Sequence, residues 1–253
     1  MIRRFNGIMI SMTATMLVML AFVVANSSQA YTAIPEDSSS AYMIEKMPEL
    51  RYYENYEDLQ ADGKTAVVYP IFTQSAYDWN GFHDYYSGYC DSCTSVKLHQ
   101  TYEKTFSSSG NGFRVLEFLG YQVIDDIDID KNPAILGQFD KVILLHNEFV
   151  TRAEFDAIVN HPNVIYLYPN ALTSKISVNY ETNVISLIRG PAHPTPDVVS
   201  GFDWKHINTQ YEKDWNCDSW NFYKIDNGHM LNCYPETFLP DNGYEILKKL
   251  KTL

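Results

Sequence analysis

The chain changes between two hydrophobic periods, and the run from Asp140 to Thr151 shows the change most clearly. Residues 142–145 are consecutive apolar residues, which is typical of a strand buried on both faces of a parallel sheet. Apolar residues then recur at helical spacing, and Thr151 is an N-cap candidate with Glu154 three residues later. The pattern therefore predicts a buried strand that is followed by an amphipathic helix.

Similar units lie on both sides of this run. The pattern predicts strands over residues 65–72, 121–129 and 163–168. It predicts a helix that ends near Gly120 and a short helical turn over residues 134–139. Strands that alternate with helices in this way predict an α/β fold with a doubly wound, mostly parallel sheet and right-handed crossovers.

Two stretches depart from this alternation. Residues 73–93 are polar and aromatic without an apolar period, which predicts a long functional loop. From about residue 176 the pattern predicts an antiparallel β appendage, with strands over residues 180–188 and 220–231 and a closing helix over residues 244–250. The α/β domain with its appendage would then span residues 65–253.

The first residues have the order of a targeting segment. Arg3 and Arg4 precede an apolar run over residues 8–25, and a small-x-small sequence ends at Ala30. We expect residues 1–30 to be a signal peptide and residues 31–64 a tether and N-terminal arm, with the mature protein secreted. An uncleaved segment that anchors the chain to the membrane remains the alternative.

The net charge and the cysteines indicate which partners and which cellular compartment to expect. The net charge is −12 without a cluster of basic residues, which argues against nucleic acid as a partner. All four cysteines lie in the exported part, which favours disulfides.

The cysteines fall into two pairs in the sequence. Cys217 and Cys233 flank a hairpin signal at Asn227, so we expect them to be joined. Cys90 and Cys93 form a CxxC motif, for which a local disulfide is the first interpretation and a redox pair or zinc site are alternatives.

Candidate chemistry lies at the end of the central strand. His146 and Glu148 follow it directly, at the carboxyl edge where open α/β sheets bind ligands. The turn after residue 168 carries no nucleophile, and no phosphate-binding glycine motif or HExxH helix occurs. By themselves the two residues could equally cap a helix and bind loop amides.

Three segments resemble the C-terminal domain of the N,N-dimethylformamidase large-subunit family. Residues 73–81, TQSAYDWNG, resemble its T-x-x-A-Y-N-x-W-G-G motif. Residues 114–130 are similar to W-L-E-x-x-G-Y-x-V-x-Y-x-T-D-x-D-L, and residues 139–158 to V-x-x-x-G-H-x-E-Y-W-S-x-x-x-R-D-A-L. The segments occur in the family's order and cover roughly half of the mature chain.

The resemblance implies a fold and a metal site. The fold would be flavodoxin-like or class I glutamine-amidotransferase-like, with the cysteine nucleophile absent. The site would be a mononuclear iron held by two tyrosinates and a glutamate. Tyr77 matches the first tyrosine and Glu148 the glutamate, with His146 beside the metal to handle protons.

The second tyrosine is assigned from a shorter match. Tyr102, in VKLHQTY, resembles the family's V-S-F-x-R-P-Y and is preferred to Tyr85 and Tyr86. Phe149 and Val150 stand where the family has Tyr and Trp, and the family's large additional domain is lacking, so the substrate does not transfer.

Two functions from different classes follow. The first is an iron-dependent hydrolase that acts on a small amide C–N bond, with His146 and Glu148 as catalytic groups. The second is a non-catalytic cell-surface module that uses the aromatic residues of 77–89 to bind a surface ligand. The sequence leaves the oligomeric state open.

Overall fold

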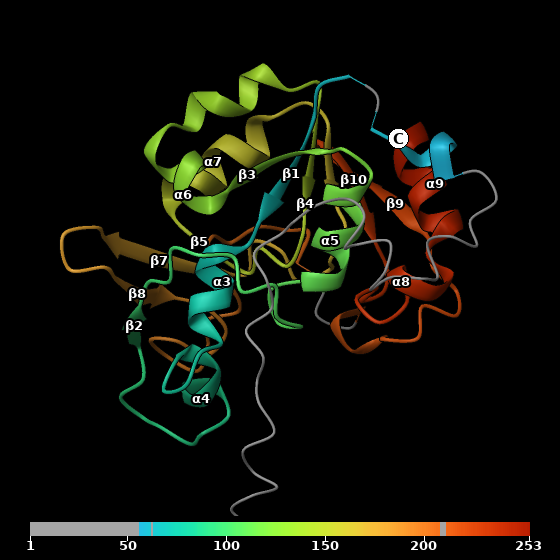
Figure 1. Cartoon of the computed structure of the whole chain (residues 1–253). Coiled ribbons are helices and arrows are strands. Elements are labelled where there is room, and N and C mark those ends of the chain that lie inside the picture. The colour runs from blue at the N-terminus through green and yellow to red at the C-terminus, as the bar shows by residue number, and fades with distance from the viewer. Residues whose placement is uncertain (1–55, 62, 208–210) are drawn as a thin grey trace, which may run out of the picture. The chain divides into compact units, whose positions relative to one another are not determined.

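The computed structural model describes residues 56–61, 63–207 and 211–253. The expected signal peptide and most of the expected tether lie outside these residues. The described chain is α/β, with a mostly parallel main sheet and a second, mixed sheet (Figure 1). The predicted fold class is confirmed at this level.

The main sheet has six strands in the order β3-β1-β4-β6-β10-β9. Neighbouring strands are parallel, except that β10 and β9 form an antiparallel hairpin. All residues of β1 are buried, as expected for a strand covered on both faces. In chain order the strands are β1 Thr65–Tyr69, β3 Gln122–Asp125, β4 Lys141–Leu144, β6 Val164–Tyr166, β9 Phe222–Ile225 and β10 Gly228–Leu231.

Helices cover both faces of this sheet. Successive strand residues point to opposite faces, so Val67 packs in the same core as α5 (Gly110–Phe118) and α9 (Tyr244–Thr252). Val68 packs in the core that contains α7 (Arg152–Asn160) and the neighbouring helices. Those neighbours are α6 Asp126–Lys131 and the 3-10 helix η3 Pro133–Gln138.

A second sheet has the strand order β2-β8-β7-β5. Its shortest strand, β5 (Phe149–Val150), directly follows the segment that carries His146 and Glu148, and pairs in parallel with β7. The other pairs are antiparallel. The remaining bounds are β2 Ser95–Lys97, β7 Ser174–Asn179 and β8 Val184–Arg189.

The predicted strand over residues 121–129 is wrong in its second half. The strand ends at Asp125, whose side chain accepts from Asp128 N while the Asp128 side chain accepts from Asp125 N, a capping box that starts α6. The apolar residues beyond Asp125 therefore belong to a helix. The prediction failed because the aspartates around the capping box alternate with apolar residues, which is also the pattern of a strand.

The predicted loop over residues 73–93 is wrong as well. Its first residues belong to α3 (Ile71–Ala76), which is entirely buried, and α4 (Phe82–Tyr86) follows. Two further short helices are α8 (Leu239–Asn242) and the 3-10 helix η4 (Tyr211–Lys213), and η2 (Tyr56–Leu59) precedes β1.

The appendage prediction is wrong for residues 220–231. The hairpin of β9 and β10 extends the main sheet, because β10 pairs in parallel with β6. Gly228 permits this close approach, since a Cβ there would lie 1.8 Å from the Val164 carbonyl oxygen. The predicted strand over residues 180–188 starts too early, because residues 180–183 form the turn between β7 and β8. These two strands pair antiparallel with each other in the second sheet and not with the hairpin of β9 and β10.

Both predicted disulfides are confirmed, Cys90 to Cys93 and Cys217 to Cys233. They are consistent with an oxidising, extracellular compartment. Over the described part of the chain, no helix is both long and apolar enough to cross a membrane.

Candidate functional site

Buried polar side chains gather at the carboxyl ends of the parallel strands. His146 and Asn147 follow β4, Asn170 follows β6, Asp126 follows β3 and Glu236 follows β10, and all of them are buried. Burying so many polar groups is unfavourable unless they bond to one another. We therefore take the carboxyl edge as the candidate site, which is also where open α/β sheets bind ligands.

Backbone bonds fix the segment that carries His146 and Glu148. The Glu148 amide donates to Thr73 Oγ1 at 3.0 Å, and the Phe149 amide donates to the same oxygen at 3.2 Å. The His146 amide donates to Ser109 Oγ at 2.9 Å. Helix α3 and the start of α5 thus hold the segment from two sides.

The imidazole of His146 has a defined tautomer. Its Nδ1 lies 2.6 Å from the Ser107 carbonyl oxygen, which can only accept, so Nδ1 carries the hydrogen. Its Nε2 accepts a hydrogen bond from the Asn170 side-chain amide and lies 3.3 Å from Glu148 Oε2. In the neutral ring Nε2 is therefore the acceptor atom, next to a carboxylate.

Tyr77 completes this group. It is the C-cap of α3, and its hydroxyl donates to Glu148 Oε2 at 2.9 Å. Its ring stacks on His83 at 5.1 Å between centroids and lies 5.6 Å from the His146 ring. The structure thus brings together Tyr77, His146 and Glu148, which come from two of the three segments that carry the resemblance.

Tyr102 lies in different surroundings. Its hydroxyl donates to Asp125 Oδ2 at 2.9 Å, and its ring packs on Tyr69 at 4.2 Å. Burial, followed by the charge of Asp125, raises the pKa of Tyr102. Its assignment as the second tyrosine ligand stays a prediction that none of these contacts supports.

Tyr86 was set aside in favour of Tyr102, but its ring centroid lies 6.4 Å from that of Phe149, the residue that follows Glu148. Its hydroxyl oxygen is buried without a well-formed hydrogen bond, and so is the nearby Ser174 Oγ. Burial first, and then the charge of Glu148, raises the pKa of Tyr86. Gly190 leaves room for this phenol, because a Cβ there would lie 2.4 Å from its oxygen.

These groups fit a hard cation. A phenol and a carboxylate already share a contact, and a second phenol oxygen nearby is buried without a well-formed bond. Such oxygen donors suit an oxidised iron. Among the described residues no cluster of three or more His, Cys, Asp or Glu side chains could hold a metal, so this site would depend on its tyrosines.

Glu236 is a site residue that the sequence did not indicate. Its oxygens accept from the Asn111 amide at 2.7 Å, the Gly112 amide at 3.2 Å and the Tyr168 hydroxyl at 2.6 Å. It therefore caps the N-terminus of α5. Burial raises its pKa to about 7, although the hydrogen bonds from Tyr168, Asn111 and Gly112 act in the opposite direction.

A second buried carboxyl pair lies behind the site segment. Asp126 accepts from the Phe72 amide at 2.8 Å and from the Asn147 side chain. Glu154 contacts Asp126, and within the described residues its oxygens have no well-formed hydrogen bond. Desolvation raises the pKa of both carboxyls. Only the spacing of Asp125 and Asp128 hinted at the helix start that buries Asp126.

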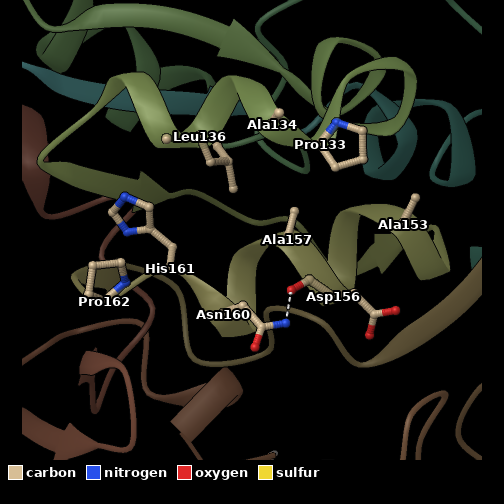
Figure 2. A pocket seen from close by; sticks show the side chains of 10 residues that line it. Pro133, Ala134, Leu136, Ala153, Asp156, Ala157, Asn160, His161 and Pro162 are labelled. Carbon is tan, nitrogen blue, oxygen red and sulfur yellow. Dashed lines mark hydrogen bonds between the residues drawn. The ribbon is translucent and has the colours of Figure 1, made fainter.

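A hollow elsewhere on the surface lacks comparable chemistry. It has a volume of about 560 Å³ and lies between η3 and α7 (Figure 2). Its walls are mainly apolar and include Leu136, Ala153 and Ala157. The titratable His161 on its rim bonds only to backbone groups. We therefore do not assign the site to this hollow.

Comparison with protein-family models gives no match to this chain, and comparison with curated protein sequences gives none either. The resemblance to the N,N-dimethylformamidase family therefore rests on the three sequence segments.

Proposed function

We propose that this chain is an exported, iron-dependent hydrolase that cleaves the C–N bond of a small amide at the carboxyl edge of its main sheet. One observation carries the proposal. The Tyr77 hydroxyl lies 2.9 Å from Glu148 Oε2, although 71 positions separate the two residues. The resemblance assigned both as ligands of one metal, which requires such an encounter.

In this proposal Tyr77 and Glu148 hold the metal, with Tyr86 or Tyr102 as the third ligand. A bound ferric ion would polarise the amide carbonyl, activate water and favour the phenolate forms of its tyrosines. His146, with its hydrogen on Nδ1, offers Nε2 as the acceptor for a proton from the attacking water. Nε2 would return this proton to the nitrogen that leaves when the C–N bond breaks.

Neighbouring residues keep this proton path in place. Asn170 donates to Nε2, and the Ser107 carbonyl holds Nδ1 at 2.6 Å. The side chains of His146 and Glu148 are only 4% and 12% exposed, so they have little contact with solvent. Restricted access strengthens electrostatic interactions among groups in the site.

The sheet order supports the finer fold assignment. Numbered along the chain, the five parallel strands take the order 2-1-3-4-5, which is the flavodoxin-like order. Acyl-enzyme chemistry through cysteine is disfavoured, because all four cysteines are in disulfides. This agrees with a glutamine-amidotransferase-like domain that lacks the nucleophile.

The location belongs to the same proposal. Two disulfides suit an extracytoplasmic compartment, and the basic and apolar start of the chain suits export. Intact-mass analysis of the purified protein should show the loss of residues 1–30. Retention of these residues with membrane sedimentation would support the anchored alternative.

A non-catalytic binding module is the second candidate. It is favoured by the exposed aromatic side chains of Trp79 and Tyr89, which are 82% and 84% exposed. Such residues often mark surfaces that bind other molecules. The two candidates differ in whether Tyr77 and Glu148 affect turnover.

The test is amine release from a panel of small amides after reconstitution with iron. We expect release by the parent, and loss of at least about a hundredfold in Glu148→Gln, since a neutral amide is a poorer ligand for a hard cation. Glu181→Gln and Tyr89→Phe are matched controls on exposed residues. Equal rates in Glu148→Gln, Tyr77→Phe and the parent would contradict the hydrolase proposal.

A further inference from the structure

Three aromatic side chains form a continuous group beside His146. The ring of Phe106 lies 5.9 Å from Trp215 and 5.9 Å from Tyr234, and Trp215 lies 6.3 Å from Tyr234. Phe106 and Trp215 are 45% and 52% exposed, whereas Tyr234 is 5% exposed. We call Phe106, Trp215 and Tyr234 the aromatic wall, which extends from solvent to the buried histidine.

The wall is continuous with the candidate site. The Tyr234 ring meets the His146 ring edge to face at 5.4 Å, and its hydroxyl lies 3.3 Å from His146 Nδ1. Ser107, the neighbour of Phe106, provides the carbonyl oxygen at 2.6 Å from the same nitrogen. The exposed rings of the wall therefore connect to His146 through Tyr234.

Covalent and hydrogen bonds keep the wall in position. The Cys217 to Cys233 disulfide joins the segment of Trp215 to the segment of Tyr234. The Tyr234 amide donates to the Asp214 carbonyl at 2.8 Å, and Thr237 Oγ1 donates to the Trp215 carbonyl at 3.0 Å. A wall held in this way loses little freedom when a ligand binds.

The chemistry of the wall selects its ligand. Two adjacent, half-exposed rings offer faces and edges for stacking with another flat ring. The Glu148 carboxylate and the chain's net charge of −12 disfavour an anionic ligand. A neutral ring attached to an amide satisfies both conditions.

We propose that the aromatic wall binds the ring of a neutral aromatic amide and places its C–N bond at His146. This inference rests on the proposed function and names its substrate class. The ring can belong to the acyl part or to the amine part of the amide, as in benzamide or acetanilide. Phe106 and Trp215 would then determine specificity, without contributing to the chemical step.

The test measures binding separately from turnover. Benzamide and acetanilide are titrated into the iron-loaded protein by calorimetry, with acetamide as the ligand that lacks a ring. We expect both aromatic amides to bind more tightly than acetamide, and the tighter of the two identifies the part that carries the ring. Trp215→Ala and Phe106→Ala should each weaken aromatic binding about threefold to tenfold.

Val199→Ala is the control, because it shortens another exposed apolar side chain, in the segment between β8 and β9. It should leave binding unchanged. Acetamide binding should be the same in all variants, which also shows that each variant is folded.

The outcomes separate the two proposals. Aromatic binding that depends on Trp215 and Phe106 without hydrolysis would support the wall and contradict the proposed function. Hydrolysis with equal affinity for acetamide and the aromatic amides, or with no effect of either wall substitution, would overturn the wall and leave the proposed function standing.

Discussion

Two buried histidines occupy opposite kinds of position in this fold. His161 follows α7 at the amino end of β6, and its two ring nitrogens bond to backbone groups of Asn163 and Phe139. His146 follows β4 at the carboxyl edge, and its Nε2 faces the side chains of Asn170 and Glu148. Burial alone therefore does not mark a catalytic histidine. The direction of the strand and the nature of the partners distinguish the two.

The largest expected effect concerns turnover. His146→Ala should lower the rate of amide hydrolysis about 10²-fold to 10⁴-fold, because it removes the proton acceptor. His161→Ala should leave the rate of the folded protein unchanged, since its ring contacts only backbone. Single-turnover kinetics on both variants makes the comparison. An equal loss of rate in both variants would show that the different surroundings of the two histidines do not matter for catalysis.

The second effect concerns stability, and here the substitution of His161 is the informative one. His161→Ala should lower the free energy of unfolding by about 1–3 kcal/mol, because the Phe139 carbonyl and the Asn163 amide lose their partner inside the protein. Urea unfolding at neutral pH measures this. An unchanged midpoint would show that water replaces the ring at no cost and that His161 does not stabilise the fold.

The third effect follows from the buried pair Asp126 and Glu154. Their pKa values are raised by burial in the folded state, so the folded pair retains a proton that the unfolded chain releases above about pH 4. This contribution to stability is present at acid pH and is lost as the pH rises through the raised values. The free energy of unfolding should therefore fall between about pH 5 and 8, by at most ~1.4 kcal/mol per pH unit for each proton.

Glu154→Gln checks the assignment, because an amide needs no proton to lie beside Asp126. The variant should flatten the dependence on pH. Glu236 contributes in the same direction, since its pKa is raised to about 7. A stability that rises with pH over this range in the parent would contradict the raised pKa values.

The smallest effect compares two tyrosines. Tyr102→Phe should cost about 1 kcal/mol of stability, because its bond to Asp125 is lost, and should spare metal binding. Tyr86→Phe should weaken metal binding, because its hydroxyl oxygen lies near Glu148 without a well-formed bond. Iron titration of both variants decides between them. The reverse result would restore the ligand chosen from the sequence.

Local signals predicted the central unit well. The apolar run before His146 is a buried strand, and Thr151 Oγ1 accepts from the Glu154 amide at 3.1 Å, as the capping pattern indicates. Both features depend on neighbours in the sequence. They place His146 and Glu148 at the sheet edge without any knowledge of the rest of the chain.

Features that depend on distant partners were not predictable from the pattern. The hairpin of β9 and β10 has a recognisable turn, but only its pairing with β6 places it in the main sheet. Glu236 accepts a hydrogen bond from the amide of Gly112, which lies 124 positions away in the sequence, so no local pattern marks it. The contacts of Tyr102 and Tyr86 are likewise set by tertiary packing, so the second tyrosine could not be chosen from a short motif.

The central claim is that Tyr77 and Glu148 meet in order to hold a metal. Elemental analysis of the purified protein and of Glu148→Gln, with the visible absorption spectrum of each, tests it most directly. The account predicts about one iron per chain and a tyrosinate charge-transfer band in the parent, both reduced in the variant. The claim would be contradicted if the parent is colourless and takes up no transition metal on reconstitution, and if Glu148→Gln has the same metal content and spectrum.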